Sequence, residues 1–346
     1  MPQGPVWWLH LPRCSGTLAQ RYFINKATAQ MTDILTLTLN PTVDFSTSTK
    51  RVRADHKLRC DAPMRDPGGG GINVARAIHI LGGDACAFAA VGGHMGRILL
   101  GLLGEEGVQF HGFDIPGETR QSMAVIERKS GKQYRFVMPG PIWNAELVKR
   151  ALQDIHRTVP KNGYVVLSGS NPPGVPDDFP AMLAQKIADT GARLIVDISG
   201  KALRWMTLNP SNPPYLLRMD KAEAEDLFGA PMETVAALAE FATTLVSRGV
   251  AQVIVLALGA KGSVLVTKDQ SWHAAAADVP VKSKVGAGDS FVGAMTLSLA
   301  KGEPLSQALQ KGAAAASAAV MTDATRLCPR SEAEALVAKC PLVQLT

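Results

Sequence analysis

Residues 164–199, "YVVLSGSNPPGVPDDFPAMLAQKIADTGARLIVDIS", contain two apolar runs that are separated by a longer mixed segment. Each run, YVVL and LIV, is continuously apolar instead of alternating, which is typical of strands buried on both faces of a parallel sheet. The segment 177–190 between them predicts a helix, and parallel neighbours need such a crossover connection. The stretch therefore predicts an α/β fold.

The same alternation of strands and helices continues in both directions along the chain. Two segments, 45–66 and 119–138, break this rhythm, and the second contains a hairpin turn at Ser130-Gly131. We therefore expect a three-layer α/β sandwich with a mostly parallel central sheet, and a small antiparallel β lid near 45–66 and 119–138. Further strands are predicted just before Asn40-Pro41 and at 86–93, 215–219, 252–259 and 263–268, and further helices at 72–81, 95–104, 144–157, 221–228, 233–248, 288–301 and 304–321.

The composition argues against nucleic-acid and membrane partners. The chain has 346 residues, 46% of them hydrophobic, and a formal net charge of +6. Three positive charges, on Arg13, Arg21 and Lys26, lie in the first thirty residues, which contain no acid. We find neither a basic stripe with interleaved aromatic residues nor an uncharged apolar run of about 18 residues. The modest positive charge suits a small anionic substrate.

The first thirty residues differ in composition from the rest. Their apolar patch, VWWLHLP, is interrupted by His10 and follows no positive side chain, so it makes a poor secretory signal. A transit peptide is the less favoured alternative. We expect residues 1–30 to be a poorly ordered extension upstream of a second start-like Met31, and 31–340 to be the folded domain. Five scattered cysteines without CxxC spacing indicate reduced thiols in a cytoplasmic protein.

The stretch "KSKVGAGDSF", residues 282–291, is a candidate anion site. Gly286 and Gly288 allow a positive φ and close backbone approach before a predicted helix. The free N–H groups and the dipole at a helix start favour an anion. Asp289 in the first turn could then accept a proton from a substrate hydroxyl. An ordinary Gly-rich turn with a favourable acid explains this stretch equally well by itself.

Two further candidates lie upstream. In "PGGGGINVAR", residues 67–76, four glycines precede a helix, and Asn73 offers both a donor and an acceptor. The spacing is not GxGxxG, so a dinucleotide fingerprint is excluded. Asp44 follows the first predicted strand, at the sheet edge where α/β proteins bind ligands. An Asx-type turn is an equally good local explanation for Asp44.

Taken together, these motifs resemble the pfkB (ribokinase-like) family of ATP-dependent sugar kinases, and within it the 6-phosphofructokinase branch. The resemblance covers about residues 31–338, and its motifs occur in the family's order. It implies a ribokinase-like fold with a small lid, and a kinase domain over 31–340. The motifs that carry it are "TLTLNPTVD", "KLRC", "PGGGGINVARAI", "TRQSM", "QYRFVMPG", "LSGSNPPGV", "VDISGKAL", "VGAGDSFVGAMTL" and "TRLC".

The resemblance assigns roles to several residues. It implies that Asp289 is the catalytic base. Arg120, Ser170, Lys57 and Arg59 would surround the phosphate of the sugar, and cations with a hydroxyl are suitable ligands for a phosphate dianion. A solvated basic face is the alternative for Lys57 and Arg59. The remaining implied residues are the anion hole of Gly286, Ala287 and Gly288, the sugar-hydroxyl ligands Asp44, Gly69, Gly70 and Asn73, and the nucleotide contacts Gly259 and Gly262.

The chain departs from the family pattern at two positions. The family's Asn-x-x-Glu motif, which positions Mg²⁺ and the ATP phosphates, has Asp220 in place of Asn, while Glu223 remains. Lys284 stands before the anion hole where Thr is common. We expect Glu223, through water, and Asp220 to bind Mg²⁺. Our hypothesis is that the charges of Asp220 and Lys284 partly compensate each other.

The expected function is Mg-ATP-dependent phosphoryl transfer to a ketohexose phosphate, with fructose 6-phosphate the favoured substrate. The alternatives are fructose 1-phosphate, tagatose 6-phosphate or a neutral sugar, and, less favoured, a sensor of sugar phosphate or ATP without turnover. The resemblance also implies a homodimer that pairs through lid strands, and it is compatible with a monovalent cation.

Overall fold

Three neighbouring strands confirm the parallel sheet that residues 164–199 predict. In the computed structural model, which describes residues 33–323 and 325–345, β8 (Tyr164–Ser168) lies between β1 (Ile34–Thr38) and β9 (Arg193–Asp197). Both pairings are parallel. The helix α5 (Phe179–Ile187) connects β8 to β9, as the sequence predicted. The proposed extension 1–30 lies outside the described residues.

The large sheet extends this unit on both sides. In the part of the chain that the structure describes, its strand order is β14-β13-β12-β11-β10-β9-β8-β1-β4-β5. Neighbouring strands run parallel in the part of the sheet that contains β11, β10, β9, β8, β1, β4 and β5. At the other edge, β12, β13 and β14 pair antiparallel with their neighbours. The bounds of these other strands are β4 (Cys86–Val91), β5 (Gln109–Asp114), β10 (Leu216–Asp220), β11 (Val253–Ala257), β12 (Ser263–Val266), β13 (Ser271–Ala274) and β14 (Leu342–Gln344).

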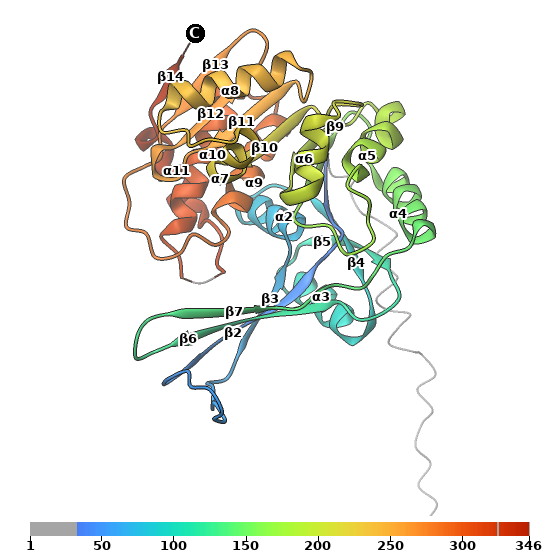
Figure 1. The fold of residues 1–346 in the computed structure, drawn as a ribbon, viewed down its shortest axis with the longest axis vertical. Helices are drawn as coiled ribbons and strands as arrows, with labels where there is room; N and C mark the ends of the chain where they lie inside the picture. The colour runs from blue at the N-terminus through green and yellow to red at the C-terminus, as the bar shows by residue number, and fades with distance from the viewer. Residues whose placement is uncertain (1–32, 324, 346) are drawn as a thin grey trace, which may run out of the picture. The chain divides into compact units, whose positions relative to one another are not determined.

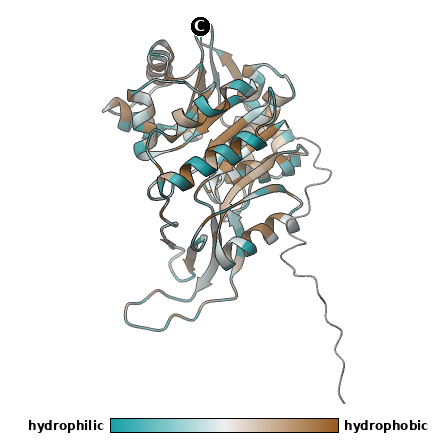
Figure 2. Cartoon of the chain, turned by 90° about the vertical axis from the view of Figure 1, so that its right-hand side faces the viewer, coloured by the Kyte–Doolittle hydropathy of each residue, from teal (hydrophilic) through white to brown (hydrophobic). Residues whose placement is uncertain are grey.

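Helices cover both faces of this sheet because its strands are apolar on both faces. Val165 and Leu167 of β8 belong to one core, and Tyr164 and Val166 to the other. In Figure 2 the hydrophobic colour follows the strands, while the helices carry both colours. Among the described residues, no helix combines the length and apolar character needed to cross a membrane. One face is covered by α4 (Ala145–Thr158), α5, α6 (Gly200–Leu208), α7 (Lys221–Phe228) and α8 (Val235–Ser247), and the other by α2 (Gly70–Ile80), α3 (Gly93–Glu105), α9 (Ala287–Ala300), α10 (Leu305–Val320) and α11 (Arg330–Leu336).

A second, smaller sheet, which we call the lid sheet, lies at the lower left of Figure 1. Its strand order is β3 (Met64–Gly68), β2 (Thr42–Thr49), β6 (Arg120–Glu127) and β7 (Gln133–Val137). The hairpin β6–β7 is as predicted, but β2 and β6 pair in parallel, so the expectation of a purely antiparallel lid is wrong. The cause is that β2 follows the carboxyl end of β1 and β6 follows the carboxyl end of β5. Both strands therefore leave the large sheet from the same side and run in the same direction.

Several elements escaped sequence prediction because they are short or lie at an edge. Among the described strands, β5 pairs only with β4, and its composition is mixed, so it lacks the apolar signature of a buried strand. The helix α6 follows β9 with only a two-residue gap and has nine residues. The other unpredicted elements are β13, β14 and α11.

Candidate active site

The glycine run packs the start of α2 against the carboxyl ends of β1 and β8. Gly69 has a φ of 123°, a conformation that side chains rarely adopt. A Cβ on Gly70 would lie 2.4 Å from Ser168 Oγ and 2.6 Å from the backbone nitrogen of Gly169. The N–H of Ile72 donates to Thr38 Oγ1 at 2.8 Å. Glycine is therefore required for the close contact that brings α2, and with it Asn73, to this edge of the sheet.

The start of α9 faces a buried guanidinium group. The helix begins at Ala287, directly after Gly286, which has a φ of 76°. A Cβ on Gly288 would lie 3.3 Å from both Nη atoms of Arg218. The free N–H groups of the first turn and the Arg218 cation thus lie beside each other. Both favour an anion at this position.

Asp289, in the first turn of α9, has the properties of a general base at neutral pH. Asn73 Nδ2 donates to its Oδ2 at 2.9 Å. Burial, and after it the negative charge of Asp197, raises the pKa of Asp289 to about 7. The Asn73 hydrogen bond and the charges of Arg218 and Arg76 act in the opposite direction. A carboxylate with a pKa near the working pH is well suited to accept a proton.

Asp197 and Arg218 form a largely buried ion pair beside Asp289. Arg218 Nη1 lies 3.0 Å from Asp197 Oδ1, and the two side chains are 14% and 12% exposed. Ser168 Oγ donates to Asp197 Oδ2 at 3.0 Å. Within the described residues, Arg218 Nε is buried and has no hydrogen-bond partner. A buried donor without a partner costs free energy, so a ligand oxygen that accepted a hydrogen bond from Arg218 Nε would be favoured.

On the lid side, Asp44 lies in β2 between Asp66 of β3 and Ser122 of β6. Burial raises the pKa of Asp44, against the hydrogen bond from Thr42 and the charges of Arg120 and Arg135. Asp44 and Arg135 line a small hollow together with Thr325. The lid carboxylate therefore faces the body of the protein near the anion hole.

Arg120 and Ser170, two of the predicted phosphate ligands, are linked by hydrogen bonds through Asn40. Arg120 Nε donates to the backbone oxygen of Asn40 at 3.1 Å, and Asn40 Nδ2 donates to Ser170 Oγ at 3.3 Å. Asn40 was not predicted as a site residue, although it directly follows the first strand. The rule that selected Asp44 would also have selected Asn40.

Lys57 and Arg59, the other two predicted phosphate ligands, lie far from Arg120 and Ser170 of the same chain. Lys57 and Arg59 are exposed in segment 50–63, at the far end of the lid sheet (Figure 1). Thr49 Oγ1 donates to the backbone oxygen of Arg59 at 3.0 Å, and Thr42, seven residues earlier in β2, pairs with Arg120. Seven strand residues at ~3.3 Å each separate the two ends by about 23 Å.

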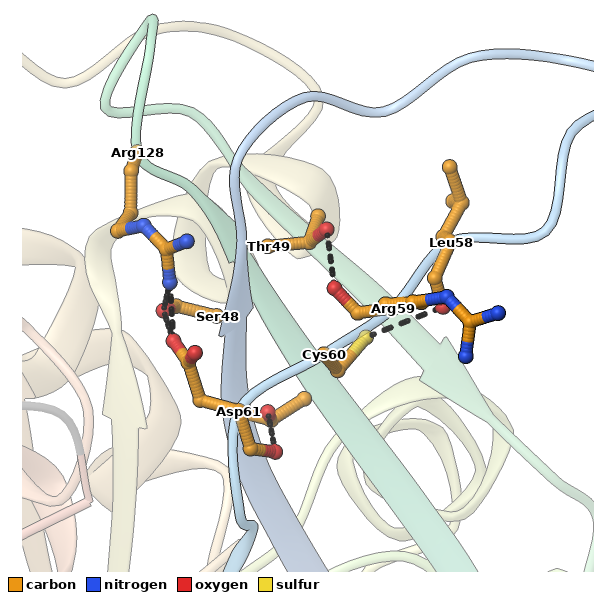
Figure 3. Close-up of polar contacts among 8 residues, drawn as sticks. Ser48, Thr49, Leu58, Arg59, Cys60, Asp61 and Arg128 are labelled. Atoms are coloured by element: carbon orange, nitrogen blue, oxygen red, sulfur yellow. Dashed lines mark hydrogen bonds and ion pairs between the residues drawn. The ribbon is translucent and has the colours of Figure 1, made fainter.

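Polar contacts hold segment 50–63 against the end of the lid sheet (Figure 3). Asp61 accepts hydrogen bonds from Ser48 and Arg128, and its backbone oxygen accepts one from Thr47. The Arg59 guanidinium points away from Arg128 in this view. Arg59 is thus presented outward by an anchored segment.

The predicted metal residues form a helix cap. Asp220 Oδ1 accepts from the N–H of Glu223 at 2.9 Å, and Glu223 Oε2 accepts from the N–H of Asp220 at 2.8 Å. This capping box starts α7 at the carboxyl end of β10. Burial, and then the charges of Asp220 and Asp197, raise the pKa of Glu223, against the Asp220 N–H and the Arg218 charge.

The predicted compensation between Asp220 and Lys284 has no contact to support it. Lys284 is exposed, and within residues 33–323 and 325–345 it forms no ion pair with Asp220. Arg218, two residues before Asp220, is the cation buried among these carboxylates.

Gly259 and Gly262, the predicted nucleotide contacts, lie in the turn between β11 and β12.

The chain is similar to known carbohydrate kinases over most of its length. The model of the pfkB family carbohydrate kinases matches residues 33–332. The chain is 38% identical to "ATP-dependent 6-phosphofructokinase isozyme 2" of Mycobacterium tuberculosis over 301 residues, which cover 87% of this chain and 88% of the relative. It is 30% identical to "1-phosphofructokinase" of Bacillus subtilis over 292 residues, 84% and 93% of the two chains.

The chain belongs to the pfkB family of carbohydrate kinases. Its fold is also that of a solved relative, the phosphofructokinase-2 from Escherichia coli in complex with potassium, with a TM-score of 0.83 and 37% identity. That comparison covers 89% of this chain and 99% of the other. The family membership makes this chain an ATP-dependent sugar kinase.

Within this kinase, sequence reasoning missed Asn40, Asp197 and Arg218. Each lies at or near the carboxyl end of a strand in the large sheet, namely β1, β9 and β10. Their positions in the strands "LTLTLN", "RLIVD" and "YLLRM" were the available signal. Nothing local distinguished them from polar residues that end a strand, because their importance depends on which strands are neighbours.

Proposed function

We propose that this chain transfers the γ-phosphoryl group of ATP to O1 of fructose 6-phosphate, giving fructose 1,6-bisphosphate and ADP. The observation that carries the proposal is the position of Asp289 in the first turn of α9, hydrogen-bonded to Asn73 and beside Arg218, where burial raises its pKa to about 7. The name of the Mycobacterium tuberculosis relative supports the choice of substrate.

In the proposed reaction, Asp289 accepts the proton of the O1 hydroxyl while O1 forms a bond to the γ-phosphorus. The bond between that phosphorus and the bridging oxygen breaks, and the electron pair leaves with ADP. The N–H groups of Gly286, Ala287 and Gly288 lie where charge develops on the transferred group. Arg218 adds a fixed positive charge at the same place.

The carboxylates at the start of α7 fit a divalent cation. Asp220 and Glu223 each use one oxygen for the helix cap and keep the other. A cation would offset the mutual repulsion that contributes to the raised pKa of Glu223. We propose that Glu223, through water, and Asp220 hold Mg²⁺, which would neutralise phosphate charge when bound. A monovalent cation is a further proposal, which the potassium complex of the Escherichia coli relative supports.

The sugar would lie between the lid sheet and α2. Asp44, Gly69, Gly70 and Asn73 would bind its hydroxyls, and Arg120 and Ser170 its phosphate. The hydrogen bonds that join Arg120 to Asn40 and Asn40 to Ser170 support this grouping. We place the adenosine near Gly259 and Gly262, at the β11–β12 turn.

A homodimer through the lid sheets would complete the phosphate site. Phe136 and Met123 are paired across β6 and β7 on one face of the lid sheet and are 53% and 37% exposed, so they form a joint apolar surface. A partner lid would cover them and would bring its own Lys57 and Arg59 toward this chain's Arg120. We also propose that 31–340 is the kinase domain, and the family match to 33–332 supports this.

The proposal is tested by measuring ADP release with a panel of sugars. Fructose 6-phosphate should support the highest kcat/KM, and Asp289→Asn should reduce kcat by about 10²- to 10⁴-fold while ATP still binds. Because the base must be ionised, kcat/KM should fall below about pH 7. Full turnover by Asp289→Asn would disprove the role of the base.

The same panel decides the substrate. Preference for fructose 1-phosphate would agree instead with the Bacillus subtilis relative's name. A preference for tagatose 6-phosphate or a neutral sugar would contradict the choice of fructose 6-phosphate and the phosphate site respectively. Calorimetric binding of ATP without turnover on any sugar would indicate a sensor.

A further inference from the structure

A chain of hydrogen-bonded polar side chains runs from Glu106, at the exposed end of α3, through the buried Arg76 to Asp289. Glu106, directly after α3, binds Arg76 through two contacts of 2.6 Å, from Arg76 Nε to Oε2 and from Nη2 to Oε1. Arg76 Nη1 donates to Asn73 Oδ1 at 3.3 Å. Asn73 Nδ2 donates to Asp289 Oδ2 at 2.9 Å. Nothing in the proposed reaction requires the outer half of this chain.

The chain determines which end of the Asn73 amide faces Asp289. A guanidinium group can only donate hydrogen bonds, so Arg76 requires the amide oxygen on its side. The amide nitrogen then faces the carboxylate. A reversed amide would oppose donor to donor at Arg76 and oxygen to oxygen at Asp289. Arg76 therefore selects the orientation in which Asn73 donates to Asp289.

Arg76 is itself held rigidly. Its side chain is 9% exposed, and Nη1 also donates to the backbone oxygen of Pro67 at 3.2 Å. Pro67 directly precedes the glycine run, and Arg76 lies three residues after Asn73 on the same face of α2. The planar, two-pronged pair with Glu106 leaves the guanidinium little freedom to rotate. A lysine could not make this set of contacts at once.

We propose that Arg76 is a positioning residue for catalysis, which acts through Asn73 to hold Asp289 in place for proton abstraction. The proposal rests on the proposed function, since it assumes that Asp289 is the base. Arg76 touches neither Asp289 nor any reacting atom directly. Glu106 anchors Arg76 from the opposite side, so the two form one unit.

The charges around Asp289 indicate a second effect of Arg76. Asp197 on β9 opposes ionisation of Asp289, whereas Arg218 on β10 and Arg76 on α2 favour it. Loss of the Arg76 charge should therefore move the acidic limb of the pH profile to higher pH. Loss of the hydrogen bond should lower the plateau above that limb, because Asp289 and Asn73 would no longer be aligned.

The experiment compares Arg76→Met with Arg76→Gln in pH profiles of kcat with fructose 6-phosphate. We expect Arg76→Met to lower the plateau about 10- to 100-fold, with KM for ATP changed less than about threefold. Arg76→Gln retains an N–H donor without the charge. Its plateau value of kcat should therefore fall less than that of Arg76→Met, while the acidic limb of its pH profile should shift by the same amount. In an Asn73→Ala background, Arg76→Met should lower the plateau much less than it does alone.

Lys311→Met is the matched control, because it breaks a similar ion pair outside the site, between Lys311 on α10 and Glu303 just before that helix, at 2.6 Å. It should leave the plateau and the limb unchanged. Thermal unfolding identifies folded variants, and Arg76→Gln serves if Arg76→Met does not fold. An unchanged plateau in a folded variant, a shift of the limb alone, or full additivity with Asn73→Ala would overturn the proposal. If instead Asp289→Asn retained activity, the proposed function itself would be wrong.

Discussion

The surroundings of Asp289 and the lid sheet differ in how separation along the sequence relates to separation in space. Around Asp289, residues that are more than two hundred positions apart come within hydrogen-bond distance, as Asn73 and Asp289 do. In the lid sheet, Lys57 and Asp44 are close in sequence, yet Lys57 lies at the far end of a strand that starts near the site. A parallel sheet gathers the carboxyl ends of many strands, whereas a projecting hairpin-like sheet spreads neighbouring residues along its length.

The largest expected effect separates Arg218, the buried cation beside Asp289, from the exposed Lys284. Arg218→Met should reduce kcat about 100-fold or more, because it removes a fixed charge at the developing phosphoryl charge. Lys284→Met should change kcat less than about threefold, since Lys284 is exposed. Steady-state kinetics with saturating ATP checks both variants. Equal losses would show that the exposed lysine matters as much as the buried arginine.

Asp197→Asn in the Arg218→Met background is the control for folding. Arg218→Met alone leaves the largely buried Asp197 carboxylate without its partner, which is destabilising. The double variant removes both charges, so it should be more stable to heat than Arg218→Met while remaining poorly active. Recovery of kcat in the double variant would mean that Arg218 acts only by pairing with Asp197.

An intermediate effect tests whether the two ends of the lid sheet serve one site. Arg120→Ala and Arg59→Ala should each raise KM for fructose 6-phosphate about 10- to 100-fold, the range expected for a hydrogen bond to a charged group. Neither should alter KM for an unphosphorylated sugar. If Arg120→Ala weakened both sugars equally, its role at the phosphate would be contradicted.

Mixed dimers decide whether Arg59 acts across the subunit boundary. A dimer of one Arg59→Ala subunit and one Asp289→Asn subunit has one complete site only if Arg59 reaches the partner's site. Mixing the two variants should therefore restore about a quarter to a half of the wild-type activity. Activity no higher than the mean of the two separate variants would place Arg59 in its own chain's site, or in none.

The smallest expected effect concerns the stability cost of Asp289, the proposed base. The pKa of Asp289 is about 7 in the folded chain, above its ordinary value of 3.8, so the folded state keeps a proton that the unfolded state has lost. Stability from this group is therefore present at low pH and is lost as pH rises toward 7. Asp289→Asn should raise Tm by a few degrees more at about pH 8 than at about pH 5. An equal change at both pH values would contradict burial as the cause of the shift.

Sequence reasoning was most successful where a local pattern has a local cause. The apolar runs of β8 and β9 require burial on both faces, and the glycines before α2 and α9 are needed for backbone approach, so both features can be recognised from neighbouring residues. The edge strand β5 and the short helix α6 lack such a pattern. The parallel pairing of β2 with β6 depends on how two distant segments leave the large sheet, which no local window contains.

The sequence by itself determined the α/β class, the alternation of the buried strands with the longer helices, and the two glycine-rich helix starts, because hydrophobic periodicity and backbone freedom act over a few residues. Only the tertiary structure decided that Arg218, not Lys284, is the cation beside the anion hole, and that Arg76 lies behind Asn73. It also decided that Lys57 and Arg59 lie apart from Arg120. These facts depend on which strands are neighbours and how far each extends, and long-range packing sets both.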